Sequence, residues 1–255
     1  MKRATIVTVR RLLSGEARFR AGAMSRGFVW GPAETAQLLM DLEAGAREQP
    51  RKSPTPERFY LGIVAISTAA KDKPAVVMDG QQRLAIIQMF LAFARDRVDE
   101  ARNTRHLDRF VWRRGMGRLA EPRLRLVNDD HGWFERNILS PGATLRLPND
   151  APEGGPRNLL ACAKFMARAF TSYSMDDIYR LADFLVENTA VVLSVSEAAP
   201  DPYIQRSLPQ PQPYARLRPE VAPELQIELR PQLRLVSDST TQPELVLSEP
   251  VRATR

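Results

Sequence analysis

The segment from Gln81 to Val98 places the strongest constraint on the fold, because apolar residues recur along it at helical spacing. Further apolar side chains widen this face beyond the stripe of an ordinary surface helix. The widened face consists of Leu84, Ile86, Ile87, Phe90, Leu91, Phe93 and Ala94. Since so broad an apolar face has to be covered by other elements, we expect a long and mostly buried helix here.

Short apolar runs elsewhere in the chain predict the strands of a small sheet, because alternating or continuous apolar stretches bounded by turn residues favour strands. These runs are residues 17–21, 58–67, 75–78 and 190–196. Other segments have the spacing of amphipathic helices. They are residues 32–45, 157–170 and 175–189. We therefore expect an α+β fold, in which the helix from Gln81 packs on a small mixed sheet.

The composition divides the chain into three parts. Residues 1–100 contain most of the predicted strands and the long helix, and residues 101–198 are mainly helical. Residues 199–255 differ from both, since they contain ten of the chain's 20 prolines and none of its 13 glycines. A proline-rich segment with few aromatic side chains buries too little apolar surface to offset its ordering entropy. We predict a largely disordered tail.

The chain is strongly basic, with a formal net charge of +7 and a pI of about 10. This charge favours polyanionic partners such as DNA or nucleotide phosphates, although scattered arginines often form no more than a solvated surface. Five arginines have near-helical spacing and could follow a nucleic-acid backbone, but a solvated helix face is the more common explanation. They are Arg102, Arg105, Arg109, Arg113 and Arg114.

Cysteine usage and hydropathy indicate a cytoplasmic protein. Cys162 is the only cysteine, which excludes an internal disulfide and a thiolate zinc site and fits a reducing compartment. Arg10 and Arg11 interrupt the short apolar stretch near the N-terminus, so it lacks the core of a signal peptide. No apolar run approaches the roughly 20 residues of a membrane-spanning helix, and we expect no membrane partner.

The sequence VVMDGQQRLAII, residues 76–87, joins a predicted strand to the long helix through an Asp-Gly-Gln-Gln-Arg motif. One interpretation is a capping box, in which Asp79 is the N-cap residue and Gln82 the third helical residue. A cap explains neither the other glutamine nor Arg83, and an arginine in the first turn faces the positive end of the helix dipole. A bound anion would offset that cost.

The alternative interpretation is a phosphate site. A strand that passes through a tight turn into a helix presents backbone amides, and Gly80 leaves room for a phosphate to approach them. Arg83 would bind phosphate oxygens through two parallel hydrogen bonds. Gln81 and Gln82 would contact a base or sugar or position a water, and Asp79 would accept a proton or hold a divalent ion through water. The residues alone support capping and phosphate binding about equally.

The motif and its surroundings also resemble a known family. VVMDGQQRL, preceded by FYLGIVAIS and by RGFVWGPAETAQLLMDL, resembles the N-terminal domain of GmrSD-type type IV restriction enzymes. The likeness extends from about residue 8 to residue 198. It implies a ParB/sulfiredoxin-like core in residues 1–100, with binding and hydrolysis of a nucleoside triphosphate (NTP), together with Mg²⁺, at the DGQQR motif.

The resemblance implies roles for individual residues. It implies no metal-ligating residue. The implied catalytic residues are Asp79, Gln82 and Arg83. The implied nucleotide-binding residues are Arg26, Gly80, Gln81, Gln82 and Arg83.

The function implied by the resemblance is an NTP-binding module of a bacterial anti-phage or modified-DNA restriction system, with NTP hydrolysis as a further expectation. DNA and a separate nuclease subunit are the implied partners, because no HNH nuclease domain follows residue 198 in this sequence. We interpret the change of composition there as a truncated or frameshifted reading frame. The alternative is a non-catalytic DNA-binding or regulatory protein of such a system, in which the motif only caps a helix.

Two other groups of residues have both a functional and a structural interpretation. Asp129, Asp130 and His131 could hold a metal, but we favour a turn before a short helix, because no second histidine lies at ligand spacing. Phe28 and Trp30 could stack on a nucleotide base, but aromatic residues beside the start of a helix are more often part of the core.

Overall fold

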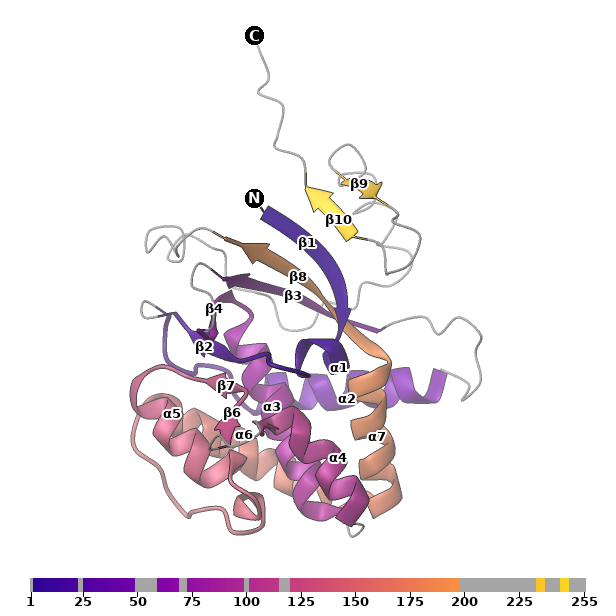
Figure 1. Ribbon diagram of the computed structural model, residues 1–255. Helices are drawn as coiled ribbons and strands as arrows, with labels where there is room; N and C mark the ends of the chain where they lie inside the picture. The colour runs from indigo at the N-terminus through magenta and orange to yellow at the C-terminus, as the bar shows by residue number, and fades with distance from the viewer. Residues whose placement is uncertain are drawn as a thin grey trace.

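The computed structural model describes residues 2–22, 25–48, 59–68, 73–98, 101–114, 120–197, 233–236 and 244–247. These residues form a mixed α+β structure, as the sequence predicts, with a mixed sheet and helices gathered along one side of it (Figure 1). Apolar side chains from residues 1–100 and from residues 101–198 join in one core.

The main sheet of residues 2–197 has six strands in the order β7-β2-β4-β3-β8-β1. They are β1 (Lys2–Thr8), β2 (Phe19–Ala21), β3 (Phe59–Ser67), β4 (Ala75–Asp79), β7 (Leu124–Arg125) and β8 (Thr189–Ser196). β8 lies between β3 and β1, parallel to the first and antiparallel to the second. β4 runs parallel to β2 and antiparallel to β3, so it lies inside the sheet and not at an edge.

Three further pairings complete the described strands. β5 (Trp112–Arg113) pairs with β6 (Glu121–Pro122) outside the main sheet. In the C-terminal region β10 (Glu244–Leu247) pairs with β1, and β9 (Leu233–Val236) pairs with β10. The remainder of residues 199–255 lies outside the described residues, so the predicted disorder of the tail stays a prediction.

Seven α-helices are described in these parts of the chain. They are α1 (Val9–Leu12), α2 (Pro32–Glu48), α3 (Gln81–Arg97), α4 (Ala101–Val111), α5 (Asn128–Phe134), α6 (Gly155–Phe170) and α7 (Met175–Glu187). α5 continues into the π-helical turn η1 (Glu135–Leu139), and the 3₁₀ turn η2 (Ala143–Leu145) follows.

α2 continues past Gly45, where the sequence predicted its end. A Cβ atom at Gly45 would lie 2.7 Å from Cζ of Phe184 in α7. This glycine therefore allows two helices to approach closely and does not terminate α2.

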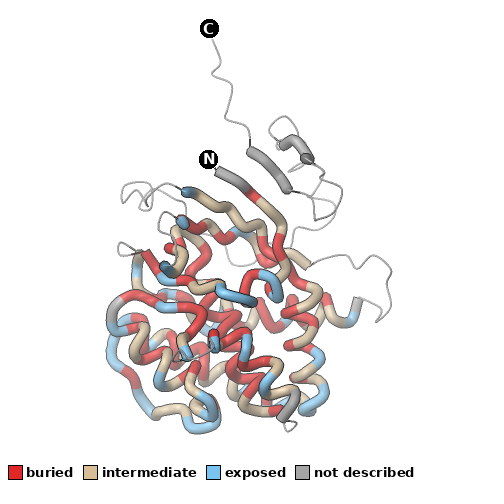
Figure 2. The backbone as a smooth tube through the Cα atoms, in the orientation of Figure 1, coloured by how far each residue is buried: buried red, intermediate tan, exposed pale blue. Residues whose placement is uncertain are grey.

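α3 is buried over most of its length, which confirms the prediction from its broad apolar face (Figure 2). All side chains of residues 84–94 are buried, including Gln88, whose Nε2 donates to the carbonyl oxygen of Phe110 at 2.8 Å. The helix packs against α4, α6 and α7 and continues directly from β4. Among the described helices, none combines the length and the apolar character needed to cross a bilayer.

Candidate functional site

The DGQQR motif lies where β4 passes into α3. β4 ends at Asp79, Gly80 adopts a left-handed conformation (φ 88°, ψ 7°), and α3 begins at Gln81. Gly80 is the N-cap residue, and no side chain caps the helix. The Asp79 Oδ1 atom instead accepts a hydrogen bond from the Gly80 amide at 2.8 Å. The capping box, one of the two interpretations of the motif, is therefore not formed, and Gln82 is the second helical residue.

Gly80 is required by its own conformation and by the neighbouring strand. Its positive φ is one that residues with a side chain rarely adopt. A Cβ atom at Gly80 would lie 3.0 Å from the carbonyl oxygen of Ile63 and 3.1 Å from Cγ2 of Val64. The glycine thus allows β3 to pass close to the turn, a role separate from the predicted approach of a phosphate.

The Gln82 side chain binds the backbone of the loop that precedes α2, residues 25–31. Its Oε1 accepts hydrogen bonds from the amides of Val29 at 2.9 Å and Trp30 at 3.4 Å. Its Nε2 donates to the carbonyl oxygen of Gly27 at 3.0 Å. Since an amide side chain has one acceptor oxygen and one donor nitrogen, both of its polar atoms are engaged in holding the loop.

Gln81 brings Arg26 of the same loop to the start of α3. The Gln81 side chain is buried, and its Nε2 donates to the Arg26 carbonyl oxygen at 3.4 Å. Arg26 itself is exposed. The structure therefore brings together two residues that the sequence predicts in one nucleotide site although they are 55 positions apart.

Arg83 lies beneath β3 and is only 5% exposed. Its Nη1 donates to the carbonyl oxygen of Ile63 at 2.8 Å. The pairing of β3 with β8 shifts register between Tyr60 and Ile63, and such bulges redirect backbone groups and side chains. Gly62 within the bulge has a φ of 94°, and a Cβ atom there would lie 3.0 Å from Nη2 of Arg83. The guanidinium thus occupies space that Gly62 leaves open.

Two residues that the sequence did not connect with the motif also hold the loop of residues 25–31. Asp130 Oδ2 accepts a hydrogen bond from the Phe28 amide at 2.6 Å, and Asn158 Nδ2 donates to the Phe28 carbonyl oxygen at 3.0 Å. Asp130 is 6% exposed, and its burial raises the pKa of the carboxyl group. No local pattern could reveal these contacts, because they join positions 102 and 130 residues apart.

The remaining aromatic and acidic candidates have structural roles. Phe28 and Trp30 are 0% and 7% exposed, so both belong to the core. This is the position that the sequence analysis favoured over stacking on a base. Asp130 faces the Phe28 amide, whereas Nε2 of His131 lies 3.1 Å from Oε2 of Glu135 on the neighbouring turn. Asp130 and His131 therefore have different partners. Both lie on the short helix α5, as the favoured interpretation of this segment expects.

The five arginines spaced along residues 102–114 do not share one environment. Arg105 and Arg109 are exposed, and the side chain of Arg102 lies outside the described residues. Arg113 is 4% exposed and forms an ion pair with a glutamate, and Arg114 donates to an aspartate. The described members of this group therefore do not form a uniform basic face for DNA.

The first turn of α3 has the chemistry to receive an anion. The Leu84 amide donates to the Gly80 carbonyl oxygen at 3.0 Å, whereas the amides of Gln81 and Gln82 have no acceptor among the described residues. Such amides carry the partial positive charge of a helix N-terminus. The exposed Arg26 belongs to the loop that Gln81 holds at this turn through the Arg26 carbonyl oxygen.

Comparison with known proteins adds no assignment to this site. No protein-family model matches the chain, and no curated protein matches it either. The resemblance of the motif to GmrSD-type enzymes therefore stays a prediction from the sequence, and the candidate site depends on its geometry.

Proposed function

We propose that this protein binds an NTP, together with Mg²⁺, at the first turn of α3, and acts in the cytoplasm within a bacterial anti-phage or modified-DNA restriction system. The observation that carries the proposal is the hydrogen bond from the Gln81 side chain to the Arg26 carbonyl oxygen, which brings the loop of Arg26 to the first turn of α3. At this turn the Gln81 and Gln82 amides have no acceptor among the described residues. Helix N-terminal amides bind phosphate, and an arginine adds charge-assisted hydrogen bonds. The sequence motif and the net charge of +7 support the same class of ligand.

Phosphate contact would be made by the two amides and by the Arg26 guanidinium. Asp79 lies at the same turn, and only its Oδ1 is engaged by the Gly80 amide among the described contacts. A carboxylate in this position would hold Mg²⁺ through water or accept a proton from an attacking water. Mg²⁺ would neutralise phosphate charge during hydrolysis.

Gln82 and Arg83 would support the site by holding the chain segments around it. Gln82 fixes the loop that carries Arg26, and Arg83 fixes the bulge of β3 beside Gly80. A direct catalytic role for either side chain, as the sequence predicts, would require it to exchange these hydrogen bonds when an NTP binds. Recognition of DNA and its cleavage would involve other surfaces and a separate nuclease subunit.

The test is an equilibrium titration of the purified protein with ATP and GTP in the presence of Mg²⁺. Arg26→Ala should weaken binding by about tenfold or more, the value of one charged hydrogen bond. Arg168→Ala is the matched control, because Arg168 is also exposed but lies near the C-terminal end of α6. The contact of α6 with the loop is made by Asn158, near the N-terminal end of this helix and away from Arg168. Absence of NTP binding, or an equal loss in both variants, would contradict the proposal.

A further inference from the structure

A second cluster of polar side chains lies between α4 and α7, which neighbour each other in Figure 1. One nitrogen of His106 and one carboxylate oxygen each of Asp183 and Glu187 lie within 4.8 Å of one another. Ligand atoms about 2.0–2.2 Å from a tetrahedral ion are roughly 3.3–3.6 Å apart. Small rotations of the three side chains would therefore bring them to the separation that a bound ion requires.

The charges of this cluster favour a cation. Asp183 and Glu187 are one helical turn apart on α7, a spacing at which like charges repel. The described contact that offsets this repulsion is the ion pair between Arg10 Nη1 in α1 and Glu187 Oε1, at 2.5 Å. The Arg10 side chain is 51% exposed, so solvent screens this pair and the arginine can leave the carboxylate at small cost.

His106 supplies one ring nitrogen to this cluster and also has a buried polar atom without a partner among the described residues. Its Nε2 atom is buried and has no hydrogen-bond partner among the described residues. A buried polar atom left without a partner destabilises the folded protein. The imidazole ring packs edge-on against Phe110 and Tyr179, with centroid distances of 5.5 and 6.5 Å, which restricts its orientation.

We propose that His106, Asp183 and Glu187 bind a divalent transition-metal ion of the Zn²⁺ type, and that Arg10 and the ion compete for Glu187. One imidazole nitrogen with two carboxylate oxygens is a ligand set that suits Zn²⁺, whereas Mg²⁺ prefers oxygen ligands throughout. The bound ion would join α4 to α7 and release α1 from its ion pair. This site uses no residue of the α3 turn and does not depend on the proposed NTP binding.

The experiment is a calorimetric titration of the chelator-treated full-length protein with ZnCl₂. We expect one Zn²⁺ per chain, with affinity reduced by about tenfold or more in His106→Gln, Asp183→Asn and Glu187→Gln. Arg10→Gln should bind Zn²⁺ more tightly than the parent, because it removes the competing cation. Circular dichroism of each variant checks the fold, and the two carboxylate variants are nearly isosteric with the parent residues.

His131→Gln is the matched control, because His131 is the chain's other histidine and also lies beside a glutamate. It should leave the affinity unchanged. No Zn²⁺ binding by the parent, or binding that survives His106→Gln and the carboxylate variants, would overturn the proposed site. Weaker binding in Arg10→Gln would overturn the proposed competition.

Discussion

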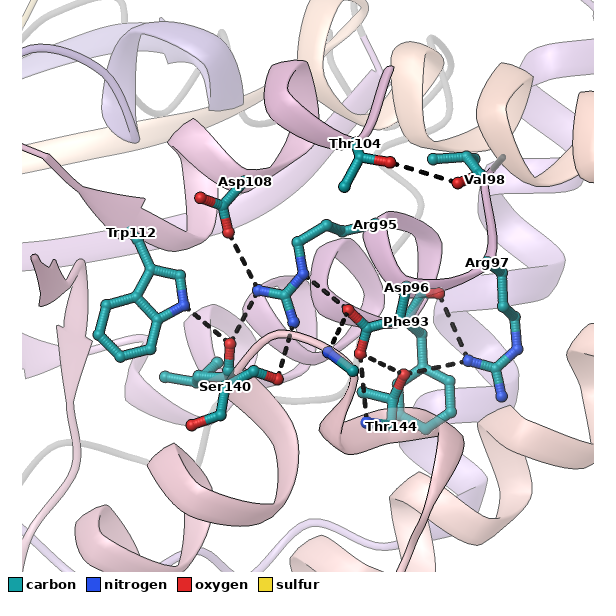
Figure 3. Close-up of polar contacts among 12 residues, drawn as sticks. Phe93, Arg95, Asp96, Arg97, Val98, Thr104, Asp108, Trp112, Ser140 and Thr144 are labelled. Atoms are coloured by element: carbon teal, nitrogen blue, oxygen red, sulfur yellow. Dashed lines mark hydrogen bonds and ion pairs between the residues drawn. The ribbon is translucent and has the colours of Figure 1, made fainter. Parts of the chain in front are cut away.

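The two ends of α3 each contain a buried arginine, but the surroundings of the two differ. At the C-terminal end Arg95 is 2% exposed and donates to the carboxylates of Asp96 at 2.8 Å and Asp108 at 3.3 Å (Figure 3). It also donates to the carbonyl oxygens of Leu139 at 2.8 Å and Ser140 at 3.0 Å. The helix dipole is negative at this end and stabilises a positive charge. The fold alone therefore accounts for Arg95.

Arg83, at the N-terminal end, is 5% exposed and donates through Nη1 to the neutral carbonyl group of Ile63. Its Cζ lies 6.0 Å from the centroid of the Trp30 ring, at the limit of a cation–π contact. The helix dipole is positive here and disfavours an arginine. Burial alone therefore does not show that an arginine serves only the fold. An anion bound at the start of α3 would lower the electrostatic cost of placing the Arg83 charge at the positive end of the helix dipole.

Replacing Arg95 should have the largest effect on stability. Arg95→Met leaves the Asp96 and Asp108 carboxylates in the core without the guanidinium, and breaking a buried pair in this way costs about 3–5 kcal/mol. Urea unfolding followed by circular dichroism measures the loss. Arg97→Met is the control, since it removes the same charge from the same turn but breaks a bond to the hydroxyl of Thr144. Equal losses of unfolding free energy in the two variants would contradict a special structural role for Arg95.

Replacing Arg83 should cost less stability and more ligand affinity. Arg83→Met breaks the bond to Ile63 but also removes a positive charge from the positive end of the dipole, so we expect a loss of about 1–3 kcal/mol. NTP affinity should fall, because the β3 bulge beside Gly80 loses its anchor. Both quantities are measured at a temperature at which the variant is folded. A loss as large as that of Arg95→Met, with NTP affinity unchanged, would show that the two arginines are equivalent.

Gln82 tests whether the loop and the motif act as one unit at the N-terminal end. Gln82→Glu keeps acceptors for the amides of Val29 and Trp30 but places a carboxylate oxygen where Nε2 donates to the Gly27 carbonyl group. We expect a loss of about 1–2 kcal/mol in unfolding free energy. NTP affinity should fall further than in Gln82→Ala, which lacks the negative charge. NTP binding at the parent level in both variants would separate the loop from the site.

The parts of the fold that could be predicted are those with a local pattern. The apolar spacing after Gln81 predicted α3, and apolar runs predicted β3, β4 and β8, because periodicity reports burial along a single element. The position of β8 between β3 and β1 has no such signal, since it is determined by contacts between distant segments. The predicted end of α2 at Gly45 was wrong for a related reason. In the sequence, a glycine that ends a helix cannot be distinguished from one that leaves space for a distant side chain such as Phe184.

The candidate site could be predicted in composition but not in hydrogen bonding. Arg26 and the motif were expected together, and the structure places the Arg26 carbonyl group against Gln81. Sequence reasoning could not find that Gly80 takes the N-cap position or that Gln82 binds the loop backbone. The partners of an amide side chain depend on which distant segment folds beside it, and only the tertiary structure reveals this.

The smallest expected effect is the pH dependence of the loop anchor Asp130. Burial raises the pKa of this carboxyl group, and the hydrogen bond from the Phe28 amide opposes part of the shift. The folded state therefore binds the proton more tightly than the unfolded state. The resulting stabilisation is complete below the ordinary pKa of an aspartate, about 3.9, and is lost as the pH rises through the folded-state pKa.

Asp130→Asn keeps an oxygen acceptor for the Phe28 amide but cannot titrate. Urea unfolding between about pH 3 and pH 7 should show the parent losing stability relative to this variant as the pH rises. Because Asp130 and Gln82 hold the same loop, their substitutions should be coupled, and those of Asp130 and Arg95 should be additive. Additivity in both pairs, or a difference that does not change with pH, would show that the loop at the N-terminal end of α3 does not depend on this carboxyl group.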